Sequence, residues 1–173
     1  MFRPLRKKSN AIDDAAAREL LARERRGVLA VAGDDGYPYA VPVNYFYDAE
    51  VGKIYLHGSK RGHKVDAIGR NDKVCFTVFG NEHVDQAETW APYMQSAVVF
   101  GRCRLIDNPE EAAAKMRQLA GKYYPSADLV EEEITHSLKA MYLYEITIEH
   151  LPASKCRKSR EGPACGRACG LLS

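Results

Sequence analysis

The chain has 173 residues, of which 46% are hydrophobic, and a formal net charge of +2. This composition suits one folded domain with a single core and excludes a largely disordered chain. No apolar run approaches the roughly 20 residues that a membrane-spanning helix requires. The first residues, among them Arg6, Lys7 and Lys8, run directly into polar sequence and lack the apolar core of a signal peptide. We therefore expect a cytoplasmic protein without a membrane partner.

The positive charge is concentrated in residues 152–173. That stretch contains a single acid, Glu161, and the five basic residues Lys155, Arg157, Lys158, Arg160 and Arg167. The rest of the chain is close to neutral and gives no indication of a nucleic-acid partner. The sequence thus predicts a folded domain over residues 1–151 and a basic, cysteine-containing, disordered tail over residues 152–173.

The five cysteines follow the same division. Cys75 and Cys103 lie in apolar runs typical of strands and are expected to pack in the core. Cys156, Cys165 and Cys169 lie in the predicted tail, and their spacing lacks the paired C-x2-C arrangement of a zinc site. No metal site is predicted.

The first half of the chain predicts one helix followed by strands. Asp13 or Asp14 can cap the helix, and Asp34-Asp35-Gly36 is typical of a hairpin turn. Pro38 and Pro42 each remove a backbone donor from a β-rich run, so this strand is expected to be bulged or at a sheet edge. The expected elements are a helix over 13–26, strands over 28–32, 37–47 and 53–57, and a short helix over 63–70.

The second half predicts three more strands and two helices. In Asn108-Pro109-Glu110-Glu111, the asparagine can cap a helix, the proline suits its first turn, and the acids face its positive end. The expected elements are a strand over 73–79, a long loop through Trp90 and Pro92, a strand over 96–106, helices over 109–123 and 130–139, and a strand over 141–150.

These elements predict a mainly β (α+β) fold. Neighbouring strands joined by tight turns favour antiparallel pairing. The strands do not alternate regularly with helices, and no glycine-rich strand-to-helix turn is present, which argues against a Rossmann sheet. A closed or split antiparallel barrel with helices packed on its outside fits best.

Residues 39–45, Tyr39-Ala40-Val41-Pro42-Val43-Asn44-Tyr45, form the first of three segments that can carry chemistry. A proline inside a strand leaves neighbouring N–H and C=O groups outside the hydrogen-bond ladder. Such groups can bind the edge of a planar heterocycle. An ordinary edge strand is the alternative interpretation.

The second segment, His57-Gly58-Ser59-Lys60-Arg61-Gly62-His63-Lys64, joins a strand to a helix. A phosphate is bound by backbone N–H groups at a helix start, by a serine hydroxyl and by a cation, and glycines allow close approach. The segment lacks the G-x4-G-K-[ST] pattern and is therefore not a P-loop. A solvated loop in front of a helix is the alternative.

The third segment runs from Trp90 to Ser96 and leads into the apolar residues 98–101. An irregular aromatic segment at this place can cover one face of a cofactor, or it can simply close a core or a dimer interface. Nucleophilic catalysis has little support, because the sequence lacks a G-x-S-x-G elbow.

Taken in order, these segments resemble the pyridoxamine-5′-phosphate-oxidase-like split-barrel flavoproteins, and within them the nitroimidazole-resistance (Nim) branch. The resemblance covers about residues 1–151. The matching segments are Gly36-Tyr37-Pro38-Tyr39, Val41-Pro42-Val43-Asn44-Tyr45, Ile54-Tyr55-Leu56-His57-Gly58-Ser59, Gly62-His63-Lys64-Val65-Asp66-Ala67-Ile68, Ser96-Ala97-Val98-Val99-Phe100-Gly101 and Leu143-Tyr144-Glu145-Ile146.

The resemblance implies a six-stranded antiparallel split barrel that forms a homodimer with FMN between the protomers. Pro42, Val43 and Asn44 would then line the isoalloxazine, and Gly58, Ser59, His63 and Lys64 would surround the phosphate. Tyr93, Gln95, Ser96 and Val98 would approach from the partner chain. His57 would contact the flavin and act as the catalytic proton donor to a small-molecule substrate.

The activity that the resemblance implies is reduction of small electron-poor compounds, including nitroimidazoles. Pyridoxamine-phosphate oxidase activity is a second reading, weakened because Arg157 and Arg160 do not reproduce the Arg-rich C-terminal motif of those oxidases. A third reading is a non-enzymatic flavin or haem carrier or sensor, in which His57 and His63 could be axial ligands.

Overall fold

The computed structural model describes residues 2–84, 92–137 and 140–156. Trp90 of the predicted cofactor cover, and Cys165 and Cys169 of the predicted tail, lie outside these residues. In the described residues, no helix is both long and apolar enough to cross a bilayer.

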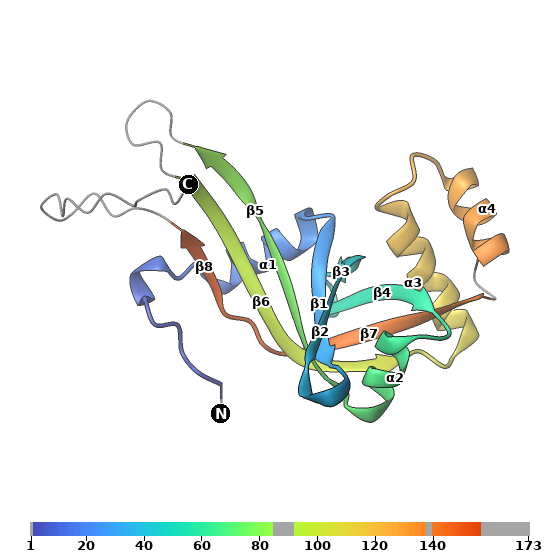
Figure 1. Cartoon of the computed structure of the whole chain (residues 1–173). Helices are drawn as coiled ribbons and strands as arrows, with labels where there is room; N and C mark the ends of the chain where they lie inside the picture. Colours follow the sequence, from blue (N-terminus) through green and yellow to red (C-terminus); the bar gives the residue numbers. More distant parts are fainter. Residues whose placement is uncertain (1, 85–91, 138–139, 157–173) are drawn as a thin grey trace, which may run out of the picture.

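In the part of the chain that the structure describes, eight strands form one antiparallel sheet (Figure 1). The strands are β1 (Arg26–Ala32), β2 (Pro38–Asn44), β3 (Phe46–Asp48), β4 (Lys53–Ser59), β5 (Lys73–Val84), β6 (Pro92–Leu105), β7 (Met141–His150) and β8 (Ala153–Cys156). They pair in the order β2-β1-β5-β6-β7-β4-β3, and β8 pairs with β6.

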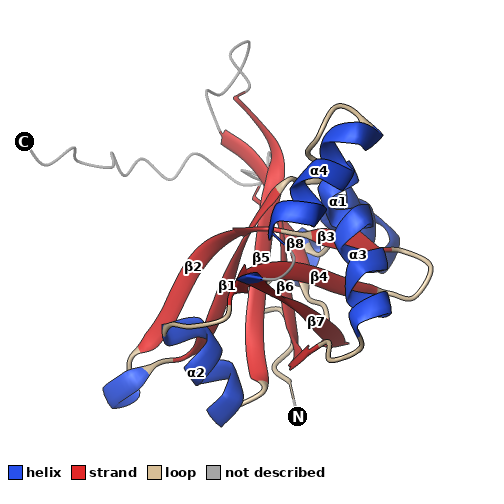
Figure 2. Ribbon diagram, turned by 90° about the vertical axis from the view of Figure 1, so that its right-hand side faces the viewer, coloured by secondary structure: helices blue, strands red, loops and turns tan. Residues whose placement is uncertain are grey.

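Within residues 2–84, 92–137 and 140–156, the elements around the sheet include four α-helices and two short 3₁₀ turns. They are α1 (Asp14–Arg23), α2 (His63–Arg70), α3 (Pro109–Gly121), α4 (Ala127–Ser137), η1 (Lys8–Asn10) and η2 (Asp34–Gly36). Helices α3 and α4 lie together beside β4, whereas α2 lies near β1 and β2 at a different end of the barrel (Figure 2).

The two ends of the strand order belong to neighbouring stretches of chain. β2 pairs with β1, and β3 pairs with β4, yet only Tyr45 separates β2 from β3. The chain at Tyr45 therefore joins the two ends of the sheet, but within the described residues no strand-to-strand hydrogen bonds close it. This makes the sheet a split barrel. Counting β2 and β3 as the one strand that the sequence predicted over 37–47 gives six main strands, with β8 in addition.

The split explains how β2 can contain a proline, since the sequence predicts that this strand is bulged or lies at a sheet edge. Pro42 lies opposite Val28 of β1, and β2 is at the end of the strand order. The second edge of β2 has no strand partner in the described chain, so the missing N–H of Pro42 does not interrupt hydrogen bonding to a second strand.

Strands β5 and β6 are longer than the sequence predicted. The sequence predicts a long loop after Phe79. This prediction is wrong for residues 80–84 and 92–95, because β5 continues to Val84 and β6 begins at Pro92. The pairing is irregular near Asn81, which has a φ of 55°. Residues 80–84 are mostly exposed, so backbone hydrogen bonds, not an apolar pattern, sustain the extension.

Strand β8 also differs from expectation, since residues 153–156 belong to the segment for which the sequence predicts a disordered tail. Ala153 pairs with Ala97, and Cys156 pairs with Met94. Ala153 is only 4% exposed and belongs to the core. The ordered fold thus extends beyond Leu151.

Two apolar clusters hold the fold together. The larger fills the barrel and includes Leu20 and Leu21 of α1 and Phe76 of β5. The smaller lies between α3, α4 and the barrel, and includes Met116 and Ile134. Burying such side chains is worth roughly 1.5–3 kcal/mol each.

The predicted starts of α1 and α3 are confirmed in detail, whereas α4 begins at Ala127, three residues before its predicted start. The Asn108 carboxamide oxygen accepts the backbone N–H groups of Glu110 at 2.9 Å and Glu111 at 3.0 Å. The Asp13 carboxylate accepts the N–H of Ala16 at 2.8 Å. These caps satisfy donors that a helix start otherwise leaves unpaired.

Tyr45 fixes the point where the chain leaves β2 and enters β3. Its N–H donates to the Tyr123 hydroxyl at 2.9 Å, and its own hydroxyl donates to the Leu21 carbonyl at 2.7 Å. Its ring meets Phe76 edge-on, with centroids 4.9 Å apart. Tyr45 is fully buried, so the strand end is tied to both α1 and the segment after α3.

A buried acid lies on the barrel wall beneath α3. Glu145 is 2% exposed and accepts from Lys53 Nζ at 2.9 Å, Arg104 Nε at 2.9 Å and the Tyr55 hydroxyl at 3.2 Å. Burial acts to raise the pKa of Glu145, but these hydrogen bonds outweigh it and lower the pKa.

Candidate functional site

A surface groove of about 700 Å³ opens at the split of the barrel. It runs between the free edge of β2 and the end of β4, with β7 behind it. Its lining residues are Arg26, Val41, Pro42, Val43, Asn44, His57, Gly58, Ser59, Lys64, Ala140 and Met141. The structure therefore brings together seven of the predicted site residues from three separate elements.

The free edge of β2 gives the groove its polar backbone. Val41, Pro42, Val43 and Asn44 pair with β1 on one side only. Their remaining backbone groups belong to the side that the described sheet leaves unpaired. This is the arrangement that the first sequence segment predicted for binding a planar heterocycle.

Lys64 brings a cation to the groove. It belongs to α2, is half-buried, and donates from Nζ to the His57 carbonyl at 3.4 Å. Its Nζ also lies 5.6 Å from the centre of the Tyr144 ring. Burial lowers the pKa of Lys64. In the part of the chain that is described, Lys64 makes no ion pair, so its charge is available to an anion.

The start of α2 lies next to Lys64. Gly62, with a φ of 120°, precedes the helix and accepts the N–H of Val65 at 2.9 Å. Such a φ strongly favours glycine. The first N–H groups of a helix and its dipole attract anions, and here they add to the charge of Lys64. Ser59 lines the same end of the groove.

His57 stands at the centre of the groove wall. Its Nδ1 is buried and has no hydrogen-bond partner within the described chain. Burial lowers the pKa of His57, Lys64 lowers it further, and Glu133 acts in the opposite direction. The imidazole is therefore neutral at pH 7, with one nitrogen able to donate and the other able to accept.

The structure places His63 beside the groove and not in its lining. The imidazole stacks on Tyr39 with centroids 4.3 Å apart, and its Nε2 lies 3.5 Å from the Asp34 carboxylate. Asp34 is also bound by Arg70 at 2.5 Å. In this arrangement His63 anchors the start of α2, and its contact with a phosphate stays a prediction.

The four predicted residues on β6 lie away from the groove of their own chain. Tyr93 packs against His83 with ring centroids 4.6 Å apart, and Gln95 bonds to Asn81. Ser96 pairs with Ser154 of β8, and the Val98 N–H donates to the Pro152 carbonyl. Their approach to a cofactor from a second chain stays a prediction.

Sequence reasoning missed several groove residues. Arg26 lies opposite Asn44 in the β1–β2 pair and adds a second cation. Met141 begins β7 beside Ser59. Both positions arise from pairing between distant strands, for which the sequence carried no local pattern. The match of Arg26 with Asn44 could have been found from the predicted hairpin register.

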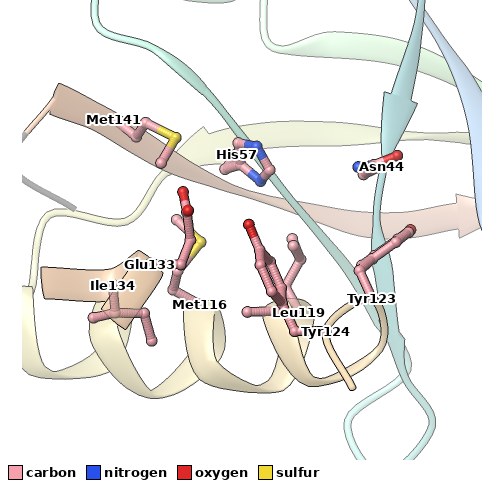
Figure 3. A pocket seen from close by; sticks show the side chains of 10 residues that line it. Asn44, His57, Met116, Leu119, Tyr123, Tyr124, Glu133, Ile134 and Met141 are labelled. Atoms are coloured by element: carbon pink, nitrogen blue, oxygen red, sulfur yellow. The ribbon is translucent and has the colours of Figure 1, made fainter. Parts of the chain in front are cut away.

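A smaller pocket of about 160 Å³ adjoins the groove (Figure 3). Asn44, His57 and Met141 line both spaces. The far wall comes from α3, from the turn after it, and from α4, and consists of Met116, Leu119, Ala120, Tyr123, Tyr124, Glu133 and Ile134. None of these seven was predicted to lie near the site, because the helices carried only the periodicity of a core-facing surface.

Residues 13–155 match the model of the pyridoxamine 5′-phosphate oxidase family. Since this match spans most of the chain, the protein belongs to that family. No curated protein sequence is significantly similar to the chain.

Solved structures share the fold at low sequence identity. A candidate 5-nitroimidazole antibiotic resistance protein of Bacteroides thetaiotaomicron has a TM-score of 0.68 and 18% identity, covering 84% of this chain and 86% of its own. A conserved hypothetical protein of Mycobacterium tuberculosis has a TM-score of 0.72 and 17% identity, with 94% and 99% covered. A FAD-binding protein of Mesorhizobium loti has a TM-score of 0.59 and 20% identity, with 85% and 97% covered.

Proposed function

We propose that the protein is a flavin-dependent oxidoreductase that binds FMN in the groove and reduces small electron-poor compounds such as nitroimidazoles. The observation that carries the proposal is the meeting in one groove of a free strand edge, the start of α2 and the Lys64 cation, which makes no ion pair with any described residue. Family membership and the FAD-binding relative support a flavin, and the nitroimidazole-resistance relative supports the substrate class.

The residues present fit FMN in both size and chemistry. The groove volume of about 700 Å³ lies within the roughly 300–1,000 Å³ of typical cofactor and ligand pockets. Pro42, Val43 and Asn44 would line the ring system, while Gly58, Ser59 and Lys64 would hold the phosphate. The bound flavin supplies the two-electron reducing chemistry.

The protein's own contribution is orientation, electrostatics and proton supply. Arg26 and Lys64 give the groove a positive potential that favours an anionic ligand. His57 lines the groove, and in its protonated form it would donate a proton to the reduced substrate.

The proposal includes a homodimer that completes the site. The groove continues past Arg26 and Pro42 onto a neighbouring surface hollow that includes Phe79. Phe79 is 54% exposed, and Val84 on the same strand is 46% exposed. A second copy of the chain seated over this hollow would cover Phe79 and would bring its own β6 segment to the cofactor.

The first test is to identify the ligand released from the purified protein by mass spectrometry and to record its absorbance. FMN with a band near 450 nm is the expected result, and a Soret band near 400 nm would overturn the flavin assignment in favour of haem. Light scattering should give twice the chain mass, and Phe79→Asp should shift it toward the monomer. A wild-type monomer that binds FMN would contradict the shared site.

The second test separates the phosphate contact from nonspecific charge. Charge-assisted hydrogen bonds are worth about 1.5–3 kcal/mol, so Lys64→Ala should weaken FMN roughly ten- to a hundredfold. Lys73→Ala removes an exposed lysine at the start of β5 and should leave the dissociation constant unchanged. Equal affinities of the two variants would refute the assignment of Lys64.

The third test concerns the activity. The flavin is reduced anaerobically with NADH or NADPH, and a nitroimidazole is then added. Reoxidation of the flavin with loss of the nitro absorbance is expected. A reduced flavin that stays reduced under strict anaerobiosis would contradict the reductase proposal.

A further inference from the structure

The side pocket beyond His57 is a separate space within the second apolar cluster. Met116, Leu119, Ala120 and Ile134 are each at most 6% exposed, yet together with Tyr123 they line a cavity of about 160 Å³. Protein interiors are normally packed without voids of this size. The pocket connects to the groove through Asn44, His57 and Met141.

The volume of the pocket sets the size of its occupant. An engineered cavity of about 150 Å³ binds benzene, so this pocket holds a single ring. The second ring of a fused system would have to extend out of the pocket into the groove, the space proposed for the flavin. The thioethers of Met116 and Met141, which lie on opposite sides of the space in Figure 3, suit a flat apolar ring.

The polar end of the pocket combines an acid and a phenol. Glu133 of α4 raises the pKa of Tyr124, chiefly through a side-chain hydrogen bond. Figure 3 shows the Glu133 carboxylate and the Tyr124 hydroxyl both directed toward the side of the pocket where His57 lies. A carboxylate accepts hydrogen bonds and repels anions.

The pocket and the groove therefore differ in charge. The groove is lined by Arg26 and Lys64 and favours anions, whereas the described pocket lining contains Glu133 and no lysine or arginine. A substrate in the pocket would present one edge to His57, which lines both spaces.

We propose that this pocket is the substrate-specificity site, that it accepts a single-ring, non-anionic compound with an N–H or O–H donor directed toward Glu133, and that it rejects anionic and fused-ring compounds. This assignment rests on the proposed function, because it deepens the substrate class of the same site. It makes Glu133 a specificity-determining residue.

The test uses four simple probes and the full-length protein. Phenol is a single neutral ring with a donor, toluene lacks the donor, benzoate is anionic, and 2-naphthol has two rings. Binding is followed by shifts of the backbone amides of His57, Ala120 and Ile134 in ¹⁵N spectra. Phenol should bind, and each of the other three should bind at least about tenfold more weakly.

Two variants with matched controls locate the binding. Glu133→Gln keeps a hydrogen-bonding group but removes the charge, so benzoate should bind at least about fivefold more tightly than to wild type, whereas exposed Glu132→Gln should change nothing. Ala120→Leu should abolish phenol binding, whereas Ala127→Leu on the exposed start of α4 should not. If Ala120→Leu fails to fold, the Glu133→Gln comparison remains decisive.

Failure of this inference and failure of the proposed function have different results. Wild-type protein that binds FMN but takes all four probes equally, or none of them, overturns the pocket assignment alone. Protein that binds no flavin overturns the proposed function, while the probe series still reports on the pocket. Unchanged benzoate affinity in Glu133→Gln overturns the role of Glu133.

Discussion

Gly58 and Lys64 occupy adjoining space so closely that a side chain at position 58 would displace the end of the lysine. A Cβ atom at position 58 would lie 2.5 Å from Lys64 Nζ and 2.9 Å from its Cε. The lysine side chain therefore lies across the backbone of β4 and reaches the His57 carbonyl. The absence of a side chain at Gly58 thus leaves room for the half-buried cation of the groove.

Gly58→Ala should displace Lys64 without disrupting the strand. Because the lysine end is flexible, the fold should lose less than about 1 kcal/mol, while FMN affinity should fall about five- to tenfold. The measurement is a flavin titration together with thermal unfolding. Gly69→Ala is the control, since a Cβ there meets nothing within 4 Å. Normal FMN affinity in Gly58→Ala would show that Lys64 is not held by this contact.

The titration of His57 should respond in opposite directions to its two charged neighbours. Burial is the largest cause of the lowered pKa of His57, followed by Lys64, and Glu133 opposes both. Lys64→Met should therefore raise the pKa of His57, and Glu133→Gln should lower it further. NMR titration of the imidazole measures both shifts, with Lys60→Met as a control expected to have little effect. Shifts of the same sign in both variants would contradict this electrostatic account.

Glu145 should contribute to stability in a pH-dependent manner. Because its pKa is lowered in the folded state, its contribution is present at neutral pH and is lost as the pH falls below about 5 toward the folded-state pKa. Glu145→Gln should cost about 1–3 kcal/mol at pH 7 and less at pH 4.

The check is denaturant unfolding at both pH values. Glu149→Gln, which removes a partly exposed partner of Arg102, should cost under about 1 kcal/mol. A Glu145→Gln penalty that is equal at pH 7 and pH 4 would argue against the charged network.

Gly27 should tolerate no side chain while Phe76 is present. A Cβ at Gly27 would overlap the ring of Phe76, which is fully buried. Overpacking of this kind costs about 1–3 kcal/mol. Phe76→Leu alone should also destabilise, but the double variant should be more stable than the sum of the single effects predicts. Additive unfolding free energies in the double-mutant cycle would rule out direct competition for space.

The sequence identified elements whose limits are set by local chemistry. Helix α2 and strand β7 begin and end within a residue of their predicted limits, because Gly62 and the apolar alternation of β7 mark them. The extension of β5 to Val84 and the pairing of Ala153 with Ala97 were missed. Both depend on backbone pairing between exposed or distant segments, which leaves no periodic signal in the residues themselves.

The candidate site was predictable to the extent that it comes from single segments. Pro42 to Asn44 and His57 to Lys64 stood out by composition, and most of them meet in the groove. The pocket residues Tyr124 and Glu133 did not stand out, since they reach His57 only through the packing of α3 and α4 on the barrel. His63 is the exception among the predicted site residues of the second segment, because it lies beside the groove and not in its lining. Its stacking on Tyr39 depends on the hairpin at Asp34, which the sequence of the segment does not indicate.

The one-residue junction at Tyr45 has a mechanical consequence. Its hydrogen bonds with Leu21 and Tyr123 connect the end of β2 to α1 and to the turn that follows α3. A displacement of α1, or of the turn after α3, would therefore alter the width of the groove at Asn44. Substitutions at residues far from the ligand can therefore change the width of the groove without altering any residue that lines the groove.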